Sequence, residues 1–312
     1  MSENKDTDTV ISFPMPEKDV IQNFILQESA IRGRVVKLTD LLNDIITPHD
    51  LPTPIEHLMA QTITMTALLS SMLKYEGVFI LQIQGDGPIS MLVCDVNSEG
   101  HARACATYNK DKYDELLKNT PEPTLKDYWG KGYLAFTVDQ GAHTDRYQGI
   151  VALEGDSLED SVQHYFEQSE QVETVIRLGV DKIDGAWKAG AVMIQRMPLD
   201  EKNVQNEIKE KDDEDWVRSS VLLKTCSKEE LLDERLDGDT LLLRLFHEEG
   251  VEILDTKAFV AQCKCSEERL IGALATMPKE DIEHIIKDGT ISTTCEFCKT
   301  TYDITPPDEL LR

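Results

Sequence analysis

The apolar positions near the start of the chain recur at the three- and four-residue spacing that predicts helices. The first such segment begins at Asp19, and its apolar residues are Val20, Ile21, Phe24, Ile25, Ala30 and Ile31. A second segment from Val35 to Ile46 repeats the period, and Pro48 ends it. Pro54 opens a third segment, which runs to Leu73 and has apolar or small residues on nearly every side. We therefore expect three helices, the third of them buried.

Alternating apolar runs bounded by turn residues predict strands in the next part of the chain. The run from Val78 to Gln84 ends at the turn sequence Gly85-Asp86-Gly87-Pro88. Further strands are expected at Ser90–Val96, His101–Tyr108, Tyr133–Val138, Tyr147–Val151, Thr174–Leu178 and Ala189–Gln195, with a helix at Leu158–Gln168 and a turn near Asp184-Gly185. Helices followed by hairpin-connected strands indicate an α+β core that ends near Met197-Pro198.

The residues after this core change sharply in composition. Glu207 to Asp215 is almost wholly charged, which indicates a solvated linker or an exposed helix. Apolar residues at helical spacing follow at Trp216, Val217, Val221 and Leu222. A capping box that begins at Ser227 precedes leucine-rich helical sequence up to Phe246. Because this segment is too short to hold a core of its own, we expect it to cover an apolar face of the strand-rich core.

Two cysteine pairs near the C-terminus have the spacing of a closed zinc site. Twenty-nine residues separate Cys263-Lys264-Cys265 from Cys295-Glu296-Phe297-Cys298. Each pair predicts one knuckle of a tetrahedral Cys₄ site, so we expect one zinc ion per chain, held by these four sulfurs. The C-x-C pair is unusual, because a disulfide within it would close a small, strained ring of the labile, regulatory kind. A zinc knuckle that only stabilises a small domain is the alternative.

The chemistry of such a site suggests a switch. Metal-bound cysteines are thiolates, which peroxide and hypohalous acid oxidise to sulfenic acid and then disulfide. Structural zinc supplies an apparent ~10–16 kcal/mol of folding energy, whereas whole domains are stable by only ~5–15 kcal/mol. Oxidation of the ligands is therefore expected to unfold residues 251–312, where short strands at Val251–Leu254 and Phe259–Val260 and helices at Ser266–Leu274 and from Pro278 are predicted.

The whole chain is expected to have an α+β fold in three parts. These are a strand-rich core domain with helices (residues 1–198), a charged helical linker (199–250) and a small C-terminal zinc-binding domain (251–312). The first sixteen residues are expected to form a disordered or loosely attached arm.

Charge and cysteine usage exclude several classes of protein. The 312 residues carry a net charge of −26, which opposes binding to nucleic acid or to anionic membranes and favours solubility. No apolar run approaches the ~20 residues of a membrane span, and the polar, acidic N-terminus lacks the features of a secretory signal. An odd number of cysteines, seven, mostly in metal-ligand spacing, indicates the reducing cytoplasm.

Other candidate residues carry weaker patterns. His284 is expected on a helix surface, because four thiolates already complete a tetrahedron. His247 lacks a zincin's second histidine, and Asp156 is expected near a helix N-terminus. The remaining cysteines are expected to be core or surface residues: Cys94, Cys105 and Cys226. No nucleophile, base and orienting group stand out, so we expect a protein that is not an enzyme.

The cysteine pattern C-x-C-x₂₉-C-x-x-C resembles that of the 33 kDa heat shock protein family, the redox-regulated holdase chaperones. The resemblance extends from about residue 17 to 305. Four further stretches carry it: Leu81–Pro88, Arg146–Asp156, Tyr165–Gln171 and Arg244–Glu249. The first sixteen residues and the other three cysteines fall outside the family pattern.

This resemblance implies a mechanism. The reduced, zinc-bound protein would be inactive, and oxidation would join Cys263 to Cys265 and Cys295 to Cys298. Zinc release would unfold the C-terminal domain and destabilise the linker. Unfolding client proteins would then bind, often to a homodimer, and later pass to an ATP-dependent foldase system.

Two rival functions are a zinc-ribbon nucleic-acid-binding regulator and a thiol-disulfide oxidoreductase. The first would need a basic face, and the second an exposed C-x-x-C near a βαβ unit.

Overall fold

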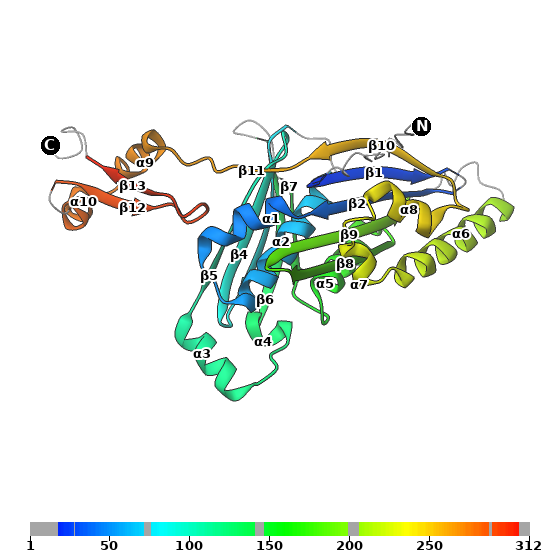
Figure 1. Cartoon of the computed structure of the whole chain (residues 1–312), viewed down its shortest axis with the longest axis horizontal. Helices are drawn as coiled ribbons and strands as arrows, with labels where there is room; N and C mark the ends of the chain where they lie inside the picture. Colours follow the sequence, from blue (N-terminus) through cyan, green and yellow to red (C-terminus); the bar gives the residue numbers. More distant parts are fainter. Residues whose placement is uncertain are drawn as a thin grey trace, which may run out of the picture.

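The computed structural model describes residues 18–305 except residue 28 and residues 72–75, 141–146, 199–205 and 287–288. The expected N-terminal arm lies outside the described residues, as do the first residues of the expected linker. Two large sheets pack around a central helix, and a small hairpin module stands to one side of them (Figure 1). The described part of the chain is therefore a strand-rich α+β structure, as expected.

A five-stranded antiparallel sheet joins strands from both ends of the chain. Its order is β10-β1-β2-β9-β8. The strands are β1 (Val20–Leu26), β2 (Ile31–Leu38), β8 (Thr174–Ile183), β9 (Ala186–Arg196) and β10 (Val251–Ala258). β10 leads toward the C-terminal module, and its pairing with β1 fixes the start of that module to the sheet.

The prediction of two helices at the start of the chain is wrong for most of their length, because these residues form strands of this sheet. The segment from Asp19 to Ile31 is not helical but forms β1 and the start of β2. The expected helix Val35–Ile46 is correct only from Asp40, because Val35 to Leu38 complete β2. Apolar residues cover both faces of these strands, so the usual alternation of a half-exposed strand is absent.

The second sheet contains six strands in the order β11-β5-β4-β3-β6-β7. Its strands are β3 (Val78–Gly85), β4 (Ile89–Asn97), β5 (His101–Tyr108), β6 (Gly132–Asp139), β7 (Tyr147–Ala152) and β11 (Val260–Ala261). These strands and the hairpin turn after Gly85 confirm the expected strand run. The Asp184-Gly185 turn between β8 and β9 is also confirmed, with both residues at positive φ.

Helix α2 (Thr53–Ser70) fills the space between the sheets. It contacts β2, β8 and β9 of one sheet and β3, β4 and β5 of the other. Every residue from Leu58 to Ser70 except Gln61 is buried, which confirms the expected buried helix.

The other helices lie outside this centre. They are α1 (Asp40–Ile46), η1 (Thr47–His49), α3 (Lys110–Asn119), α4 (Leu125–Trp129), α5 (Leu158–Tyr165), the π-helix η2 (Phe166–Glu170), α6 (Asn206–Thr225), α7 (Lys228–Leu232), α8 (Gly238–Phe246), α9 (Glu267–Leu274) and α10 (Lys279–Ile285). α3 and α4 were not expected. No described helix combines the length and the apolar character needed to cross a membrane.

Candidate metal centre and the covered sheet face

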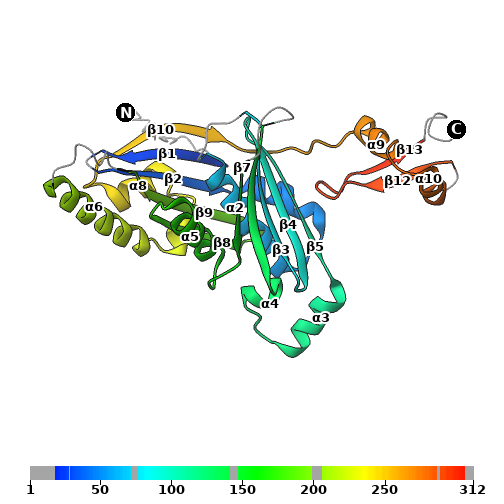
Figure 2. The ribbon, with the colours of Figure 1, turned by 180° about the vertical axis from the view of Figure 1, so that it is seen from behind.

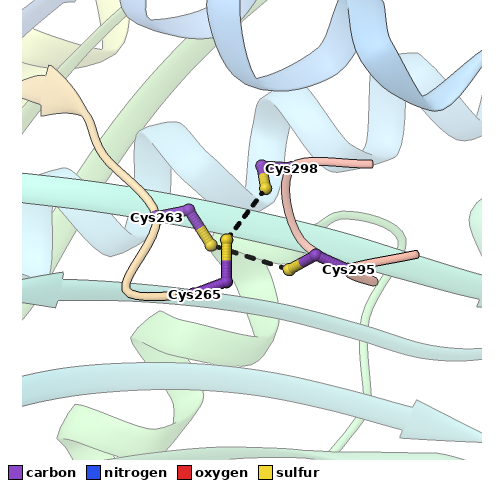
Figure 3. Close-up of side chains that lie close together, drawn as sticks. All are labelled: Cys263, Cys265, Cys295 and Cys298. Atoms are coloured by element: carbon purple, nitrogen blue, oxygen red, sulfur yellow. Dashed lines mark hydrogen bonds between the residues drawn. The ribbon is translucent and has the colours of Figure 1, made fainter. Parts of the chain in front are cut away.

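Two segments of the C-terminal module bring four cysteines to one point. Cys263 and Cys265 lie between β11 and α9, and Cys295 and Cys298 lie on the turn that joins β12 (Ile291–Thr294) to β13 (Thr301–Ile304). Figure 3 shows the four side chains converging from these two segments.

The hairpin turn is built as a tight knuckle. The Cys295 N–H donates to the Thr300 carbonyl at 2.9 Å, and the Lys299 N–H donates to the Cys295 carbonyl at 2.9 Å. Lys299 has a φ of 56°, the left-handed conformation that closes the turn. Burial raises the pKa of Cys295, although the backbone N–H groups of Cys298 and Phe297 donate to its sulfur and act in the opposite direction.

The sulfur atoms have the spacing of a tetrahedral metal site. Cys263 Sγ lies 3.7 Å from Cys295 Sγ, and Cys265 Sγ lies 3.3 Å from Cys298 Sγ. All four sulfurs lie within 4.8 Å of one another. A tetrahedron with a Zn–S length of about 2.3 Å has edges of about 3.8 Å. The four cysteines are therefore positioned to hold one metal ion, and thiolates are the ligands that zinc favours.

The electrostatics of the cluster also favour a cation. Burial and the neighbouring thiols raise the pKa of Cys265 to about 12, although the Tyr302 hydroxyl lies 3.2 Å from its sulfur. At Cys298 burial opposes ionisation, but hydrogen bonds from Thr300 lower the pKa to about 6. Cys298 thus ionises easily, and its negative charge then makes ionisation of the neighbouring thiols harder. A divalent cation at the centre removes that resistance and lets all four become thiolates.

The rest of the module offers little hydrophobic stabilisation. Its buried apolar cluster among the described residues is Leu274, Ile282, Ile291 and Ile304. Four side chains cannot provide the burial that a domain of this size needs, so a bound metal would supply much of its stability.

The core contacts both knuckles of the cysteine cluster. Arg103 of β5 places its guanidinium carbon 3.9 Å from the centre of the Phe297 ring, and its Nη1 lies 4.0 Å from Cys263 Sγ. Arg103 Nε donates to Asp95 at 2.8 Å, and His49 Nε2 donates to the Phe297 carbonyl at 2.8 Å. The sequence did not identify Arg103 or His49, because a single arginine in a strand and a single histidine after a helix belong to no motif.

A second candidate region is the outer face of the five-stranded sheet. Helices α6, α7 and α8 lie across this face (Figure 1). The sheet contributes Phe24, Leu26, Ile31, Val35, Val175, Val192 and Ile194 to one apolar cluster. The three helices and the turn between α6 and α7 contribute Trp216, Leu223, Cys226, Leu231, Leu241, Leu242, Leu245 and Phe246. The expected docking of the middle segment on the core is confirmed by these contacts.

Helix α6, however, turns a largely polar face toward the sheet. Its buried residues are Asp212, Asp215, Trp216, Ser219, Ser220 and Leu223. Asp212 accepts a hydrogen bond from Arg196 of β9 at 2.7 Å, while the two serine hydroxyls have no hydrogen-bond partner among the described residues. Val217 and Val221 are 61% and 56% exposed, so only part of the apolar residues at helical spacing in α6 contribute to the covering of the sheet. Buried polar groups without partners make this contact weak for its length.

The family of the chain follows from sequence comparison. A model of the family described as Hsp33 protein matches residues 19–305. The chain belongs to the Hsp33 family. The 33 kDa chaperonin of Caulobacter vibrioides (strain NA1000 / CB15N) is 34% identical over 294 residues, covering 93% of this chain and 95% of the relative. The 33 kDa chaperonin of Escherichia coli O7:K1 is 34% identical over 289 residues, covering 92% of each.

A solved structure supports the fold of this Hsp33 family member. The crystal structure of the 33 kDa chaperonin (heat shock protein 33 homolog) from Thermotoga maritima aligns with a TM-score of 0.76 at 21% identity. The alignment covers 94% of this chain and 97% of that one. The α+β architecture described above is therefore the architecture of the family.

The remaining candidates of this Hsp33 family member are not part of the four-cysteine cluster, although Cys105 interacts electrostatically with Cys295. Cys94, Cys105 and Cys226 are buried, and burial raises the pKa of each thiol. His284 is exposed, as expected, and His247 is exposed as well. The turn at Gly85 and the loop that carries Asp156 before α5 are structural features, without further candidate ligands among the described residues.

Proposed function

We propose that this member of the Hsp33 family is a redox-regulated holdase chaperone and not an enzyme. The observation that carries the proposal is the convergence of Cys263, Cys265, Cys295 and Cys298 within 4.8 Å, in a module with a minimal apolar core. Relatives named 33 kDa chaperonin support a chaperone function. We also propose that residues 1–198, 199–250 and 251–312 act as core, linker and switch.

In the reduced state, we propose, the four cysteines hold one zinc ion as thiolates. When bound, zinc ties the two knuckles together and so stabilises the module. Each cysteine pair can give up two electrons to a peroxide and form a disulfide, and the peroxide is reduced to water. The proposed pairs are Cys263–Cys265 and Cys295–Cys298. The sulfur–sulfur contacts of 3.7 and 3.3 Å both join cysteines of different knuckles, so peptide mapping of the oxidised protein is needed to assign the pairs.

Oxidation of the four cysteines would also weaken the packing of the middle segment on the five-stranded sheet. β10 connects the module to the five-stranded sheet, and the C-terminal end of α8 lies just before it in the chain. Once the module unfolds, the weakly held α6 and its neighbours would separate from the sheet. Clients would then bind the apolar side chains that were covered. Homodimer formation in the oxidised state, transfer of clients to an ATP-dependent foldase system and a cytoplasmic location belong to the same proposal.

Light scattering of a chemically denatured client tests the function directly. We expect oxidised protein to suppress aggregation and reduced, zinc-loaded protein not to. A chain with Cys298→Ser should bind zinc at least tenfold more weakly, because it loses one ligand, whereas Cys226→Ser should keep full zinc affinity. Equal suppression by both redox states would contradict the switch. Catalysed reduction of insulin disulfides would instead favour the rival oxidoreductase function.

A further inference from the structure

A cavity of about 160 Å³ lies where the two sheets meet beside α5 and η2, far from the cysteine cluster in the chain. The walls are mostly apolar and aromatic: Leu69, Phe79, Phe136, Tyr165, Phe166 and Val172. These residues come from α2, β3, β6, α5, η2 and the segment after η2. Figure 2 shows α5 beside β8 and β7 at this junction. Such a mostly apolar hollow with few polar groups is typical of a small-molecule site.

The volume of the cavity limits a bound ligand to a single ring. An apolar protein cavity of about 150 Å³ binds benzene, so this one has room for one six-membered ring and a small substituent. Aromatic walls favour an aromatic ring, because edge-to-face contacts stabilise it beyond the burial of its surface. Phe136 and Tyr165 already make such a contact, with ring centres 4.3 Å apart and planes at 85°.

One polar group in the wall lacks a partner. Arg32 Nε is buried and has no hydrogen-bond acceptor among the described residues. A buried donor on a charged group is costly when it is left unpaired. The amide of Gln195, by contrast, is engaged at both ends, since it accepts from Arg34 at 3.2 Å and donates to Thr174 at 3.1 Å.

The acidic group at the cavity is also satisfied. Glu170 accepts a hydrogen bond from the Tyr165 hydroxyl at 2.5 Å and another from Tyr147. Glu170 ends the π-helix η2, and the Val172 N–H returns to the Phe166 carbonyl at 3.0 Å. Short π-helical turns are frequent at functional sites. The group in the wall that needs an acceptor is therefore Arg32, and not Glu170.

We propose that this cavity is a binding site for a small aromatic carboxylate, with the ring against the aromatic wall formed by Phe79, Phe136 and Tyr165 and the carboxylate on Arg32. A carboxylate fits better than a neutral acceptor, because hydrogen bonds between charged partners are about twice as strong as neutral ones. The residues of the cavity are separate from the four cysteines and from the cluster beneath α6 to α8. The site therefore adds a ligand-binding function to the proposed chaperone function and does not depend on it.

Titration of the reduced full-length chain with benzoate, followed by NMR of ¹³C-labelled methyl groups, tests the proposal. We expect saturable shifts at Leu69 and Val172, while methyl groups beside the cysteine cluster stay unchanged. Acetate, which lacks the ring, and benzyl alcohol, which lacks the charge, should each bind at least tenfold more weakly. The proposal is overturned if benzoate gives no saturable shift, or if either analogue binds as tightly as benzoate.

Three variants assign the site to named residues. Arg32→Met keeps the aliphatic stem but removes the donor, and Val172→Phe fills the cavity from a partly exposed position. Both should weaken benzoate binding at least tenfold. Arg235→Met, which removes the same charge from a side chain that is 89% exposed, should leave it unchanged. Wild-type affinity in both cavity variants would overturn the assignment, and the wild-type shifts remain decisive if either variant fails to fold.

Discussion

Arg103 connects three parts of the molecule that are distant in the sequence. Its guanidinium covers the Phe297 ring of the second knuckle, approaches Cys263 of the first, and pairs with Asp95 of β4. Lys264, between the first two cysteines, also reaches Asp95 at 3.7 Å. A cation over an aromatic ring contributes about 0.5–2 kcal/mol. The core thus holds the cysteine module through side chains that are not metal ligands.

Replacement of Arg103 should lower the threshold of the proposed switch. In Arg103→Met the module loses about 1–2 kcal/mol of docking energy, so we expect hydrogen peroxide to release zinc about 5 to 30 times faster. The zinc content of the reduced protein should stay at wild-type level, because the four ligands are intact. A chromogenic zinc indicator measures the rate, and Arg235→Met is the control. An unchanged release rate would show that docking does not limit oxidation.

A buried carboxylate makes the middle segment sensitive to acid. Glu249, 3% exposed after α8, accepts hydrogen bonds from Arg218 of α6 at 2.6 and 2.8 Å. These bonds, opposed by burial, lower the pKa of Glu249. Its folded pKa therefore lies below the unfolded value of about 4.3. The resulting stabilisation is complete above that pH and is lost as the pH falls through the folded pKa.

We therefore expect Glu249→Gln to destabilise the segment at pH 7 and to make little difference near pH 2. Urea unfolding followed by Trp216 fluorescence measures the free energy of unfolding at each pH. Glu248→Gln, whose carboxylate is 81% exposed, serves as the matched control. A destabilisation by Glu249→Gln that is the same at both pH values would contradict the linkage.

At the scale of elements, the sequence predicted those strands and helices in which apolar residues recur with one clear spacing. The hairpin of β3 and β4, the buried helix α2 and the capping box at Ser227 all carry local chemistry that the structure confirms. β1 and β2 were misjudged because their two faces pack on different layers. Ile21 and Val36 face α2, whereas Phe24 and Val35 face α8, so apolar residues occur on both faces and produce a helix-like spacing by coincidence.

The candidate metal site could be predicted from spacing alone, but its contacts with the core could not. Cysteine pairs reveal ligands because metal geometry restricts their separation. Arg103 and His49 contact Phe297 only because the fold brings them together, and no local sequence pattern predicts these contacts. The polar inner face of α6 was missed for a related reason, since its partner Arg196 lies on another element.

A lysine of β2 holds the end of helix α7 against the sheet. Lys37 Nζ of β2 donates to the carbonyl groups of Glu230, Leu231 and Asp233 at 3.2, 2.8 and 3.2 Å. Lys37→Met should leave these carbonyls without that donor and destabilise the segment by about 1–3 kcal/mol. Amide hydrogen exchange should show lower protection in α7 and unchanged protection in α2. Lys188→Met, which removes an ion pair with the half-exposed Glu234, should have a much smaller effect; equal effects would contradict the role of Lys37.

At the scale of the whole molecule, the middle segment is a removable cover over the outer face of the five-stranded sheet. A chain truncated after Met197 lacks α6, α7, α8 and β10, so it should present Phe24, Ile31 and Val192 to solvent. We expect it to suppress client aggregation without any oxidant, measured by light scattering against the full-length reduced chain. The net charge of the full chain, −26, favours solubility when the face is open. A folded truncation that fails to suppress aggregation would place the client site in the linker or the cysteine module.

The pairing of β1 with β10 has a consequence for synthesis. About 225 residues separate Leu26 from its partner Val251. At ~5–20 residues per second, β1 leaves the ribosome roughly 10 to 45 s before β10 is made. During that interval β1 has an unpaired edge, to which a strand from another nascent chain can add. On a polysome, the spacing between ribosomes therefore sets how often neighbouring copies meet at this edge, and slow initiation of translation favours a sheet completed within one chain.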